Sequence, residues 1–156
     1  MAELKTNAIR LLDKAKIPYT MHTDTQDGGI DALAVAAKLG EPPELVYKTL
    51  VTQGRDGYFV FVIPAGAELD LKKAAKAVGQ KAVELIPVKA LNRVTGYIRG
   101  GCSPLGMKKA YPTVIAQSAQ GLEIFYVSAG RVGLQMALSP AALSALTGAD
   151  FADITA

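Results

Sequence analysis

Two runs of β-branched and aromatic residues, separated by a glycine-flanked connection, constrain the fold more than any other feature of this sequence. The runs cover residues 46–52 and 58–63, and the segment between them contains Gly54-Arg55-Asp56-Gly57. Residues of these types favour strands, and glycines in a short connection allow the backbone conformations that tight turns need. The sequence therefore predicts an antiparallel hairpin with a four-residue connection at residues 54–57.

Helical signals lie on both sides of this hairpin. The first predicted helix carries apolar residues at helical spacing and is followed by Pro18. Its apolar residues are Leu4, Ala8, Leu11, Leu12 and Ala15. The other predicted helices are a short one between Asp31 and Gly40, one over residues 70–78, one over 88–93, and one that Ser139 caps and Gly148 ends.

Further strands are predicted at residues 19–23, 113–116, 122–128 and 134–138, with a polar loop at 24–30. Because short turns as well as helices connect the strands, a mixed and largely antiparallel sheet fits better than a doubly wound parallel one. The 156 residues, half of them hydrophobic, can bury one core without disulfides or metals. We therefore expect a mixed α/β fold, with residues 1–156 forming a single domain.

The cysteine content and the charge limit the setting in which the protein works. Cys102 is the only cysteine, so an intrachain disulfide is excluded and a reducing, cytoplasmic location is expected. The longest apolar run, at 58–67, is broken by Pro64 and is too short for a membrane-spanning helix. A net charge of +3 is compatible with an anionic partner but does not identify one.

Lys48 occupies an unusual position in the first predicted strand. Period-two alternation places its side chain on the same face as Val46 and Leu50. An ammonium group among apolar side chains is uncommon and suggests a functional site. The alternative is a lysine at a sheet edge whose charged end reaches water, because the other face of the strand is also partly apolar.

Residues 95–106 contain four glycines and one proline, a density that no regular element tolerates. Consecutive glycines allow a ligand to approach the backbone closely, and their N–H groups can hold a developing oxyanion. A tight structural turn would have the same composition. The glycine spacing matches neither the phosphate-binding nor the dinucleotide-binding pattern.

A protein nucleophile is not evident in the sequence. Cys102 lies in the glycine loop, but a nucleophilic cysteine needs a base, and the only histidine is His22, a surface or partly packed strand residue. No group of residues has the spacing of zinc ligands, and no serine lies in a nucleophile-elbow motif. We expect neither a metal nor another cofactor.

Five segments, in order along nearly the whole chain, resemble the YbaK/EbsC family. They are Val46-Tyr47-Lys48-Thr49-Leu50-Val51, Asp70-Leu71-Lys72-Lys73, Thr95-Gly96-Tyr97, Gly100-Gly101-Cys102-Ser103-Pro104-Leu105-Gly106 and Tyr126-Val127-Ser128-Ala129-Gly130. Members of this family are free-standing relatives of the editing domain of bacterial prolyl-tRNA synthetases. The resemblance implies a strongly curved mixed sheet flanked by helices. It places the essential lysine of the family on Lys48 and its Gly-x-x-x-Pro loop on residues 100–104.

The resemblance also implies a reaction, the cleavage of the ester between an aminoacyl group and the terminal ribose of tRNA. With cysteine, the thiol of the substrate attacks its own carbonyl, and the tethered geometry replaces a protein nucleophile. The Gly101 N–H group would then support the oxyanion, and Lys48 would hold the terminal adenosine, its phosphate or the departing ribose oxygen. The substrate-binding residues implied are Gly100, Cys102, Ser103, Pro104, Asp24, Ser128 and Gln135.

Departures from the family pattern bear on the choice of substrate. Asp24 stands where well-known members have tyrosine, Gln135 stands where they have aspartate, and Arg131-Val132-Gly133 replaces a Lys-Arg-Gly turn. An alanine-specific deacylase that activates a water, a tRNA-binding module without activity and a general nucleic-acid binder are the alternatives. The expected partners are the acceptor end of aminoacyl-tRNA and prolyl-tRNA synthetase, and the sequence does not determine the oligomeric state.

Overall fold

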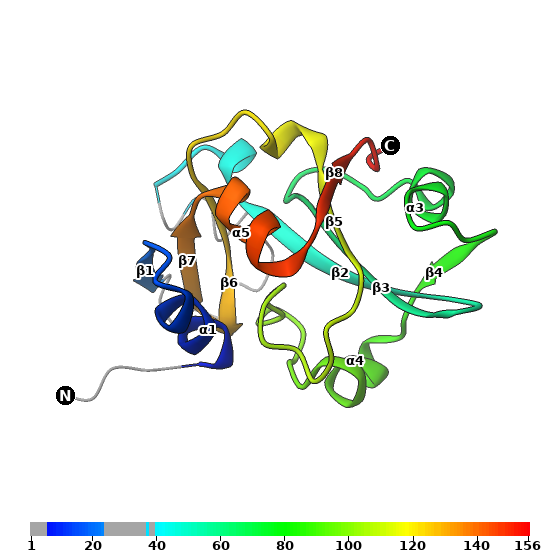
Figure 1. Cartoon of the computed structure of the whole chain (residues 1–156), viewed down its shortest axis with the longest axis horizontal. Coiled ribbons are helices and arrows are strands. Elements are labelled where there is room, and N and C mark those ends of the chain that lie inside the picture. Colours follow the sequence, from blue (N-terminus) through cyan, green and yellow to red (C-terminus); the bar gives the residue numbers. More distant parts are fainter. Residues whose placement is uncertain (1–5, 24–36, 38–39) are drawn as a thin grey trace.

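The structure, a computed structural model, describes residues 6–23, 37 and 40–156. Its helices are α1 (Asn7–Ala15), α3 (Leu71–Ala77), α4 (Val88–Thr95) and α5 (Pro140–Thr147), with 3-10 turns η1 (Pro43–Leu45) and η2 (Gln117–Ala119). Its strands are β1 (Thr20–Thr23), β2 (Tyr47–Gly54), β3 (Gly57–Pro64), β4 (Val83–Leu85), β5 (Thr113–Ala116), β6 (Phe125–Arg131), β7 (Leu134–Leu138) and β8 (Asp150–Ala152). Figure 1 shows their arrangement.

The strands form two hydrogen-bonded sheets (Figure 1). The three-stranded sheet has the order β1-β7-β6 and is antiparallel, whereas the five-stranded sheet, β4-β2-β3-β5-β8, contains both antiparallel and parallel pairs. An isolated parallel bridge between Val46 and Tyr126 joins the start of β2 to β6. The predicted fold class, a mixed α/β fold with mostly antiparallel pairing, is confirmed, with the strands divided between two sheets.

The hairpin of β2 and β3 is confirmed, but its connection is shorter than predicted. The two strands pair from Tyr47 opposite Pro64 to Gly54 opposite Gly57, so only Arg55 and Asp56 remain in the turn. Gly57 has a φ of 134°, which a residue with a side chain rarely adopts. Gly54 and Gly57 therefore form the last residue pair of the β2–β3 ladder and are not part of the turn.

The helix ends follow the capping signals in the sequence. The Asp70 side chain accepts hydrogen bonds from the N–H groups of Lys72 and Lys73, each at 3.0 Å, and so begins α3. Ser139 caps α5, and Gly148, with a φ of 74°, ends it. These boundaries were predicted because the interactions that define them are local.

The buried face of α1 differs from the predicted one. Ala8, Ile9 and Leu12 are fully buried, whereas Leu11 is 38% exposed and Ala15 is exposed. Both sets of positions have helical spacing, so periodicity alone did not identify the face that packs on the core. Leu4, the predicted loop at 24–30 and the start of the predicted helix after Asp31 lie outside the described residues.

Two three-residue strands and the bounds of β6 were not predicted. β4 and β8 lie at the two edges of the five-stranded sheet, and β6 spans Phe125–Arg131 instead of residues 122–128. Three residues are too few to establish a period of two, so such strands become visible only through their partners. β4 is important for the site because it forms part of a cavity wall.

The main hydrophobic core contains side chains from both sheets and from three helices. Its largest fully buried side chains include Phe61 from β3, Phe125 from β6 and Met136 from β7. Helices α1, α3 and α5 contribute alanines, leucines and Ile9 to the same core. This shared core fixes the relative position of the two sheets and therefore of the residues that lie where they meet.

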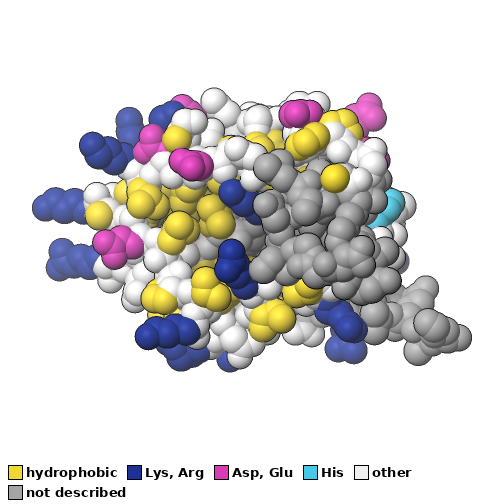
Figure 2. Space-filling view, turned by 180° about the vertical axis from the view of Figure 1, so that it is seen from behind, with side chains coloured by type: hydrophobic (Ala, Val, Ile, Leu, Met, Phe, Trp, Pro, Cys, Tyr) yellow, Lys and Arg dark blue, Asp and Glu magenta, His cyan; other side chains and the backbone are white. Residues whose placement is uncertain are grey.

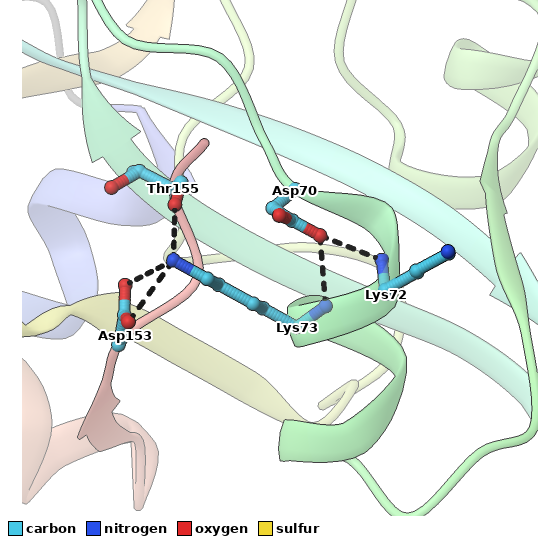
Figure 3. A network of polar contacts seen from close by, with 5 residues as sticks. All are labelled: Asp70, Lys72, Lys73, Asp153 and Thr155. Carbon is cyan, nitrogen blue, oxygen red and sulfur yellow. Dashed lines mark hydrogen bonds and ion pairs between the residues drawn. The ribbon is translucent and has the colours of Figure 1, made fainter.

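The C-terminal segment is held by the start of α3 (Figure 3). Lys73 Nζ lies 3.2 and 3.1 Å from the two carboxylate oxygens of Asp153 and donates a hydrogen bond to the Thr155 carbonyl at 3.0 Å. The Asp70 N–H group donates to the Ile154 carbonyl at 2.8 Å. These contacts fasten the chain after β8 to the first turn of α3.

Candidate functional site

A cavity of about 490 Å³ lies where β2, β4, α4, the glycine loop and the β6–β7 pair come together. Six consecutive residues from 46 to 51 line it, so the backbone of β2 runs along the cavity. Its other lining residues are Leu85, Ile86, Val88, Leu91, Arg99, Gly100, Cys102, Ser128 and Gln135. Most of the polar lining residues are those that the sequence analysis selected.

Lys48 enters this cavity because of the bridge between Val46 and Tyr126. The bridge sets the start of β2 beside β6, and Lys48 and Ser128, each two residues farther along, line the same cavity. Lys48 is partly buried, and within the described part of the chain its ammonium group has no ion-pair or hydrogen-bond partner. Its charge is therefore available to a ligand that enters the cavity.

Ser128 and Gln135 form a polar pair opposite β2. They are directly paired in the β6–β7 ladder, so their side chains lie on the same face of the sheet. Gln135 is 5% exposed, and Ser128 Oγ accepts a hydrogen bond from the Gly130 N–H group at 3.2 Å. The two side chains give the cavity an uncharged wall that can donate and accept hydrogen bonds.

Gly101 has a structural role that the sequence did not reveal. Its N–H group donates to the Ile98 carbonyl at 2.9 Å, which closes a turn in the glycine loop. A Cβ atom at this position would lie 2.8 Å from the Val132 nitrogen and 2.9 Å from the Arg131 carbonyl carbon. The predicted oxyanion donor is thus engaged within the loop, and the absence of a side chain lets the loop pack against the β6–β7 turn.

The remaining predicted loop residues divide between the cavity and the interior. Gly100 and Cys102 line the cavity. Ser103 is fully buried and its Oγ accepts a hydrogen bond from the Leu105 N–H group at 3.2 Å, and Pro104 is buried as well. Ser103 and Pro104 therefore shape the loop and do not line the cavity, and their assignment to substrate binding stays a prediction. Asp24 lies outside the described residues.

Cys102 has the properties of an inert, buried thiol. Burial raises its pKa to about 12, and a hydrogen bond with Thr95 offsets only part of this effect. His22 lies opposite Gln135 in the β1–β7 ladder, shares a 2.8 Å hydrogen bond with Thr20 and packs edge-on against Tyr126. Among the described residues, no hydrogen bond joins His22 to Cys102, so the two do not form a nucleophile and its base.

Thr49 is a candidate ligand-binding residue that the sequence analysis missed. It lines the cavity, and its Oγ1 atom is buried without a hydrogen-bond partner in the described part of the structure. A buried hydroxyl without a partner costs about 1 to 3 kcal/mol, and a polar ligand atom would recover this energy once a rotation of the side chain exposes the Oγ1 atom. Strand alternation places the side chains of Thr49 and Lys48 on opposite faces of β2. Both residues nevertheless line the cavity, because the backbone of β2 runs along it.

The rest of the cavity wall is mostly apolar, with Arg99 as a second cation beside Lys48. Leu85 and Val88 are 51% and 60% exposed, and both line the cavity mouth with Ile86 and Leu91. Figure 2 shows hydrophobic side chains gathered on one face of the molecule, with Lys and Arg side chains beside them. An apolar surface next to cations suits a ligand that combines a flat organic group with negative charge.

Residues 29–146 match the aminoacyl-tRNA editing domain family. The chain belongs to this family. In the described part of this editing domain, no three His, Cys, Asp or Glu side chains lie close enough together to hold a metal ion, and no helix is long and apolar enough to cross a membrane.

One relative supports the assignment to this family. The editing domain is 48% identical over 153 residues to a protein of Enterococcus faecalis described as a candidate Cys-tRNA(Pro)/Cys-tRNA(Cys) deacylase, EbsC, with 97% of this chain and 93% of that protein covered. The predicted resemblance to the YbaK/EbsC family is thereby confirmed.

Two solved structures share the fold. One, a hypothetical protein named APE2540, has a TM-score of 0.89 at 22% identity and covers 97% of this chain and all of its own. The other, a candidate trans-editing enzyme for prolyl-tRNA synthetase, has a TM-score of 0.84 at 24% identity and covers 99% of both chains.

Proposed function

We propose that this protein is an aminoacyl-tRNA deacylase that acts in trans and removes cysteine from Cys-tRNA(Pro), and also from Cys-tRNA(Cys). The observation that carries the proposal is Lys48, an ammonium group without a partner among the described residues, in a cavity beside the glycine loop. Membership of the editing family and 48% identity to the Enterococcus relative support the substrate class. Residues 1–156 would act as one unit in the cytoplasm.

The proposed reaction uses the thiol of the substrate. Its sulfur forms a bond to the carbonyl carbon of the same cysteinyl group, the ester C–O bond breaks, and the thiol proton ends on the departing ribose oxygen. A tethered thiol has a high effective concentration, so the protein needs only to orient the ester and stabilise charge. This fits a site in which the one cysteine is buried and its pKa is raised to about 12.

Lys48 would stabilise the end of the substrate that becomes negatively charged. Its ammonium group can hold the departing ribose oxygen or the terminal phosphate, and the apolar surface of Leu85, Val88 and Leu91 can pack against the adenine ring. Because no carboxylate in the described part of the chain pairs with Lys48, its charge is not already compensated.

The glycine loop would supply the oxyanion donors, although not through the atom first expected. The Gly101 N–H group donates to Ile98, whereas the N–H groups of Gly100 and Cys102 make no hydrogen bond to the described residues. We propose that these two N–H groups donate hydrogen bonds to the oxyanion. The close packing of Gly101 would hold them in position.

The aminoacyl group would lie between β2 and the β6–β7 pair. Thr49, Ser128 and Gln135 offer uncharged polar atoms there, which can bind an amino group or a thiol. Asp24 is a further proposed substrate-binding residue. Prolyl-tRNA synthetase is the proposed protein partner, because that enzyme charges tRNA(Pro), the tRNA named in the description of the Enterococcus relative.

The test is single-turnover deacylation of Cys-tRNA(Pro), with Ala-tRNA(Pro) and Ser-tRNA as competing esters. Wild type should release cysteine selectively, and Lys48→Ala should lower the rate by about 100-fold or more, as the loss of a charge-stabilising group does elsewhere. Lys76→Ala, which removes an exposed lysine of α3, is the matched control. An unchanged rate of cysteine release by Lys48→Ala would overturn the proposed role of Lys48. Preferential release of alanine from Ala-tRNA(Pro) would show that water, and not a substrate thiol, attacks the ester.

A further inference from the structure

A second, more open cavity of about 440 Å³ adjoins the first one. Ile86 lines both, so the two cavities meet at this residue. The floor of the second cavity includes Gln53 and Tyr58, which are directly paired across β2 and β3. One wall is formed by α4, which contributes Lys89 and Arg93. We call this second cavity the α4 groove.

The α4 groove carries two cations, Lys89 and Arg93, that form no ion pair with a described residue. Lys89 and Arg93 are one helical turn apart, so their side chains lie on the same face of α4. Both are exposed, and no carboxylate of the described residues forms an ion pair with either one. Glu84 lies opposite Gln53 in the β2–β4 ladder but does not line the groove. Such a groove favours a ligand with two or more negative charges.

An aromatic ring is also available in the α4 groove. Tyr58 is partly buried, and the edge-on contact of its ring with Tyr111, at 5.7 Å between ring centroids, restricts its orientation. A fixed tyrosine ring next to cations is the combination with which proteins bind single-stranded nucleic acids, by base stacking and phosphate contact. Gln53 adds hydrogen-bonding capacity to the same surface.

We propose that the α4 groove binds the phosphodiester backbone of the single-stranded nucleotides that precede the aminoacylated adenosine of tRNA. This inference rests on the proposed function, which places that adenosine in the first cavity. The chain of the acceptor end would pass over Ile86, with its phosphates against Lys89 and Arg93 and a base against Tyr58. The groove would thus distinguish a polynucleotide from a free aminoacyl ester.

The experiment measures binding, so that it does not depend on catalysis. Dissociation constants for the tetraribonucleotide ACCA and for adenosine are determined for wild type, for Lys89→Ala/Arg93→Ala and for Lys72→Ala/Lys76→Ala. The last variant removes the same charge at the same spacing from α3, whose residues line neither cavity. All substituted side chains are exposed, and thermal unfolding checks that each variant is folded.

Wild type should bind ACCA more tightly than adenosine. The α4 variant should bind ACCA about tenfold more weakly and adenosine as tightly as wild type does. The slope of the logarithm of the ACCA binding constant against the logarithm of the salt concentration should become shallower by about 1.4, which is about 0.7 for each lost phosphate contact. The α3 variant should bind both as wild type does. Binding without deacylation would reject the proposed function and leave the groove assignment intact.

Three results would overturn the groove assignment. One is equal affinity of wild type for ACCA and adenosine. Another is an equal loss of ACCA binding in the α3 and α4 variants, which would indicate general attraction by the net charge of the protein. The third is competition by blunt duplex RNA as strong as that by ACCA, which would assign the groove to a double-stranded backbone.

Discussion

Gly101 packs against Val132 so closely that a Cβ atom on the glycine would lie 2.8 Å from the Val132 nitrogen. This contact joins the glycine loop, which contributes Gly100 and Cys102 to the main cavity, to the turn between β6 and β7, the two strands that contribute Ser128 and Gln135. Because the neighbouring atoms are backbone, they have little freedom to move away from an added methyl group. The spacing of the two sides of the cavity therefore depends on the glycine.

Gly101→Ala should displace the loop. We expect a loss of about 1 to 3 kcal/mol in the free energy of unfolding, typical of overpacking, together with a large fall in kcat/KM for deacylation. Gly121→Ala is the matched control, because nothing lies within 4 Å of a Cβ at that position. Urea unfolding and deacylation of both variants test this, and wild-type stability in Gly101→Ala would contradict the contact.

Thr49→Val separates binding from stability. Valine has nearly the shape of threonine but lacks the hydroxyl that is buried without a partner in the described residues. The free energy of unfolding should stay the same or rise by about 1 kcal/mol, while kcat/KM falls, because the substrate loses a hydrogen bond. Parallel loss of stability and activity would show that Thr49 Oγ1 has a structural partner instead.

Cys102 should affect stability at alkaline pH but not catalysis. Its pKa in the folded protein is about 12, above the ordinary value of 9.0, so the unfolded chain loses this proton first as pH rises. The stabilising contribution of the protonated thiol is complete below pH 9 and is lost between pH 9 and pH 12. Wild type should therefore lose about 1 kcal/mol more than Cys102→Ala between pH 8 and pH 10.

The measurement is urea unfolding of wild type and Cys102→Ala at the two pH values. Deacylation by both proteins is assayed at about pH 7.5. Cys102→Ala should keep its deacylase activity, because the thiolate is not the proposed nucleophile. Abolished activity in a folded Cys102→Ala variant would restore the nucleophile hypothesis.

Lys73→Ala should loosen the C-terminal segment without affecting the site. The substitution removes the ion pair with Asp153 and the hydrogen bond to the Thr155 carbonyl (Figure 3). Because Lys73 and Asp153 are 42% and 52% exposed, we expect a loss of only about 0.5 to 1 kcal/mol. Hydrogen exchange should quicken in β8, and Lys72→Ala should leave it unchanged.

The elements predicted correctly are those whose signals are local. Runs of β-branched and aromatic residues on either side of Gly54 and Gly57 indicated the hairpin, and Asp70, Ser139 and Gly148 marked helix ends through interactions within a few residues. Leu11 was assigned to the wrong face of α1, because two faces of that helix carry apolar residues and only packing selects one. The edge strands β4 and β8 were missed because three residues carry too weak a pattern.

The sequence by itself determined the family and the fold class, because short motifs and periodicity encode both, and it singled out Lys48 and the glycine loop as candidate site residues. Tertiary structure alone decided that Lys48, Thr49, Ser128 and Gln135 share a cavity, because this depends on a bridge between residues 80 positions apart, Val46 and Tyr126. It also decided that the Gly101 N–H group is already engaged. Long-range packing fixes which polar groups remain free for a ligand, and no local pattern in the sequence encodes that selection.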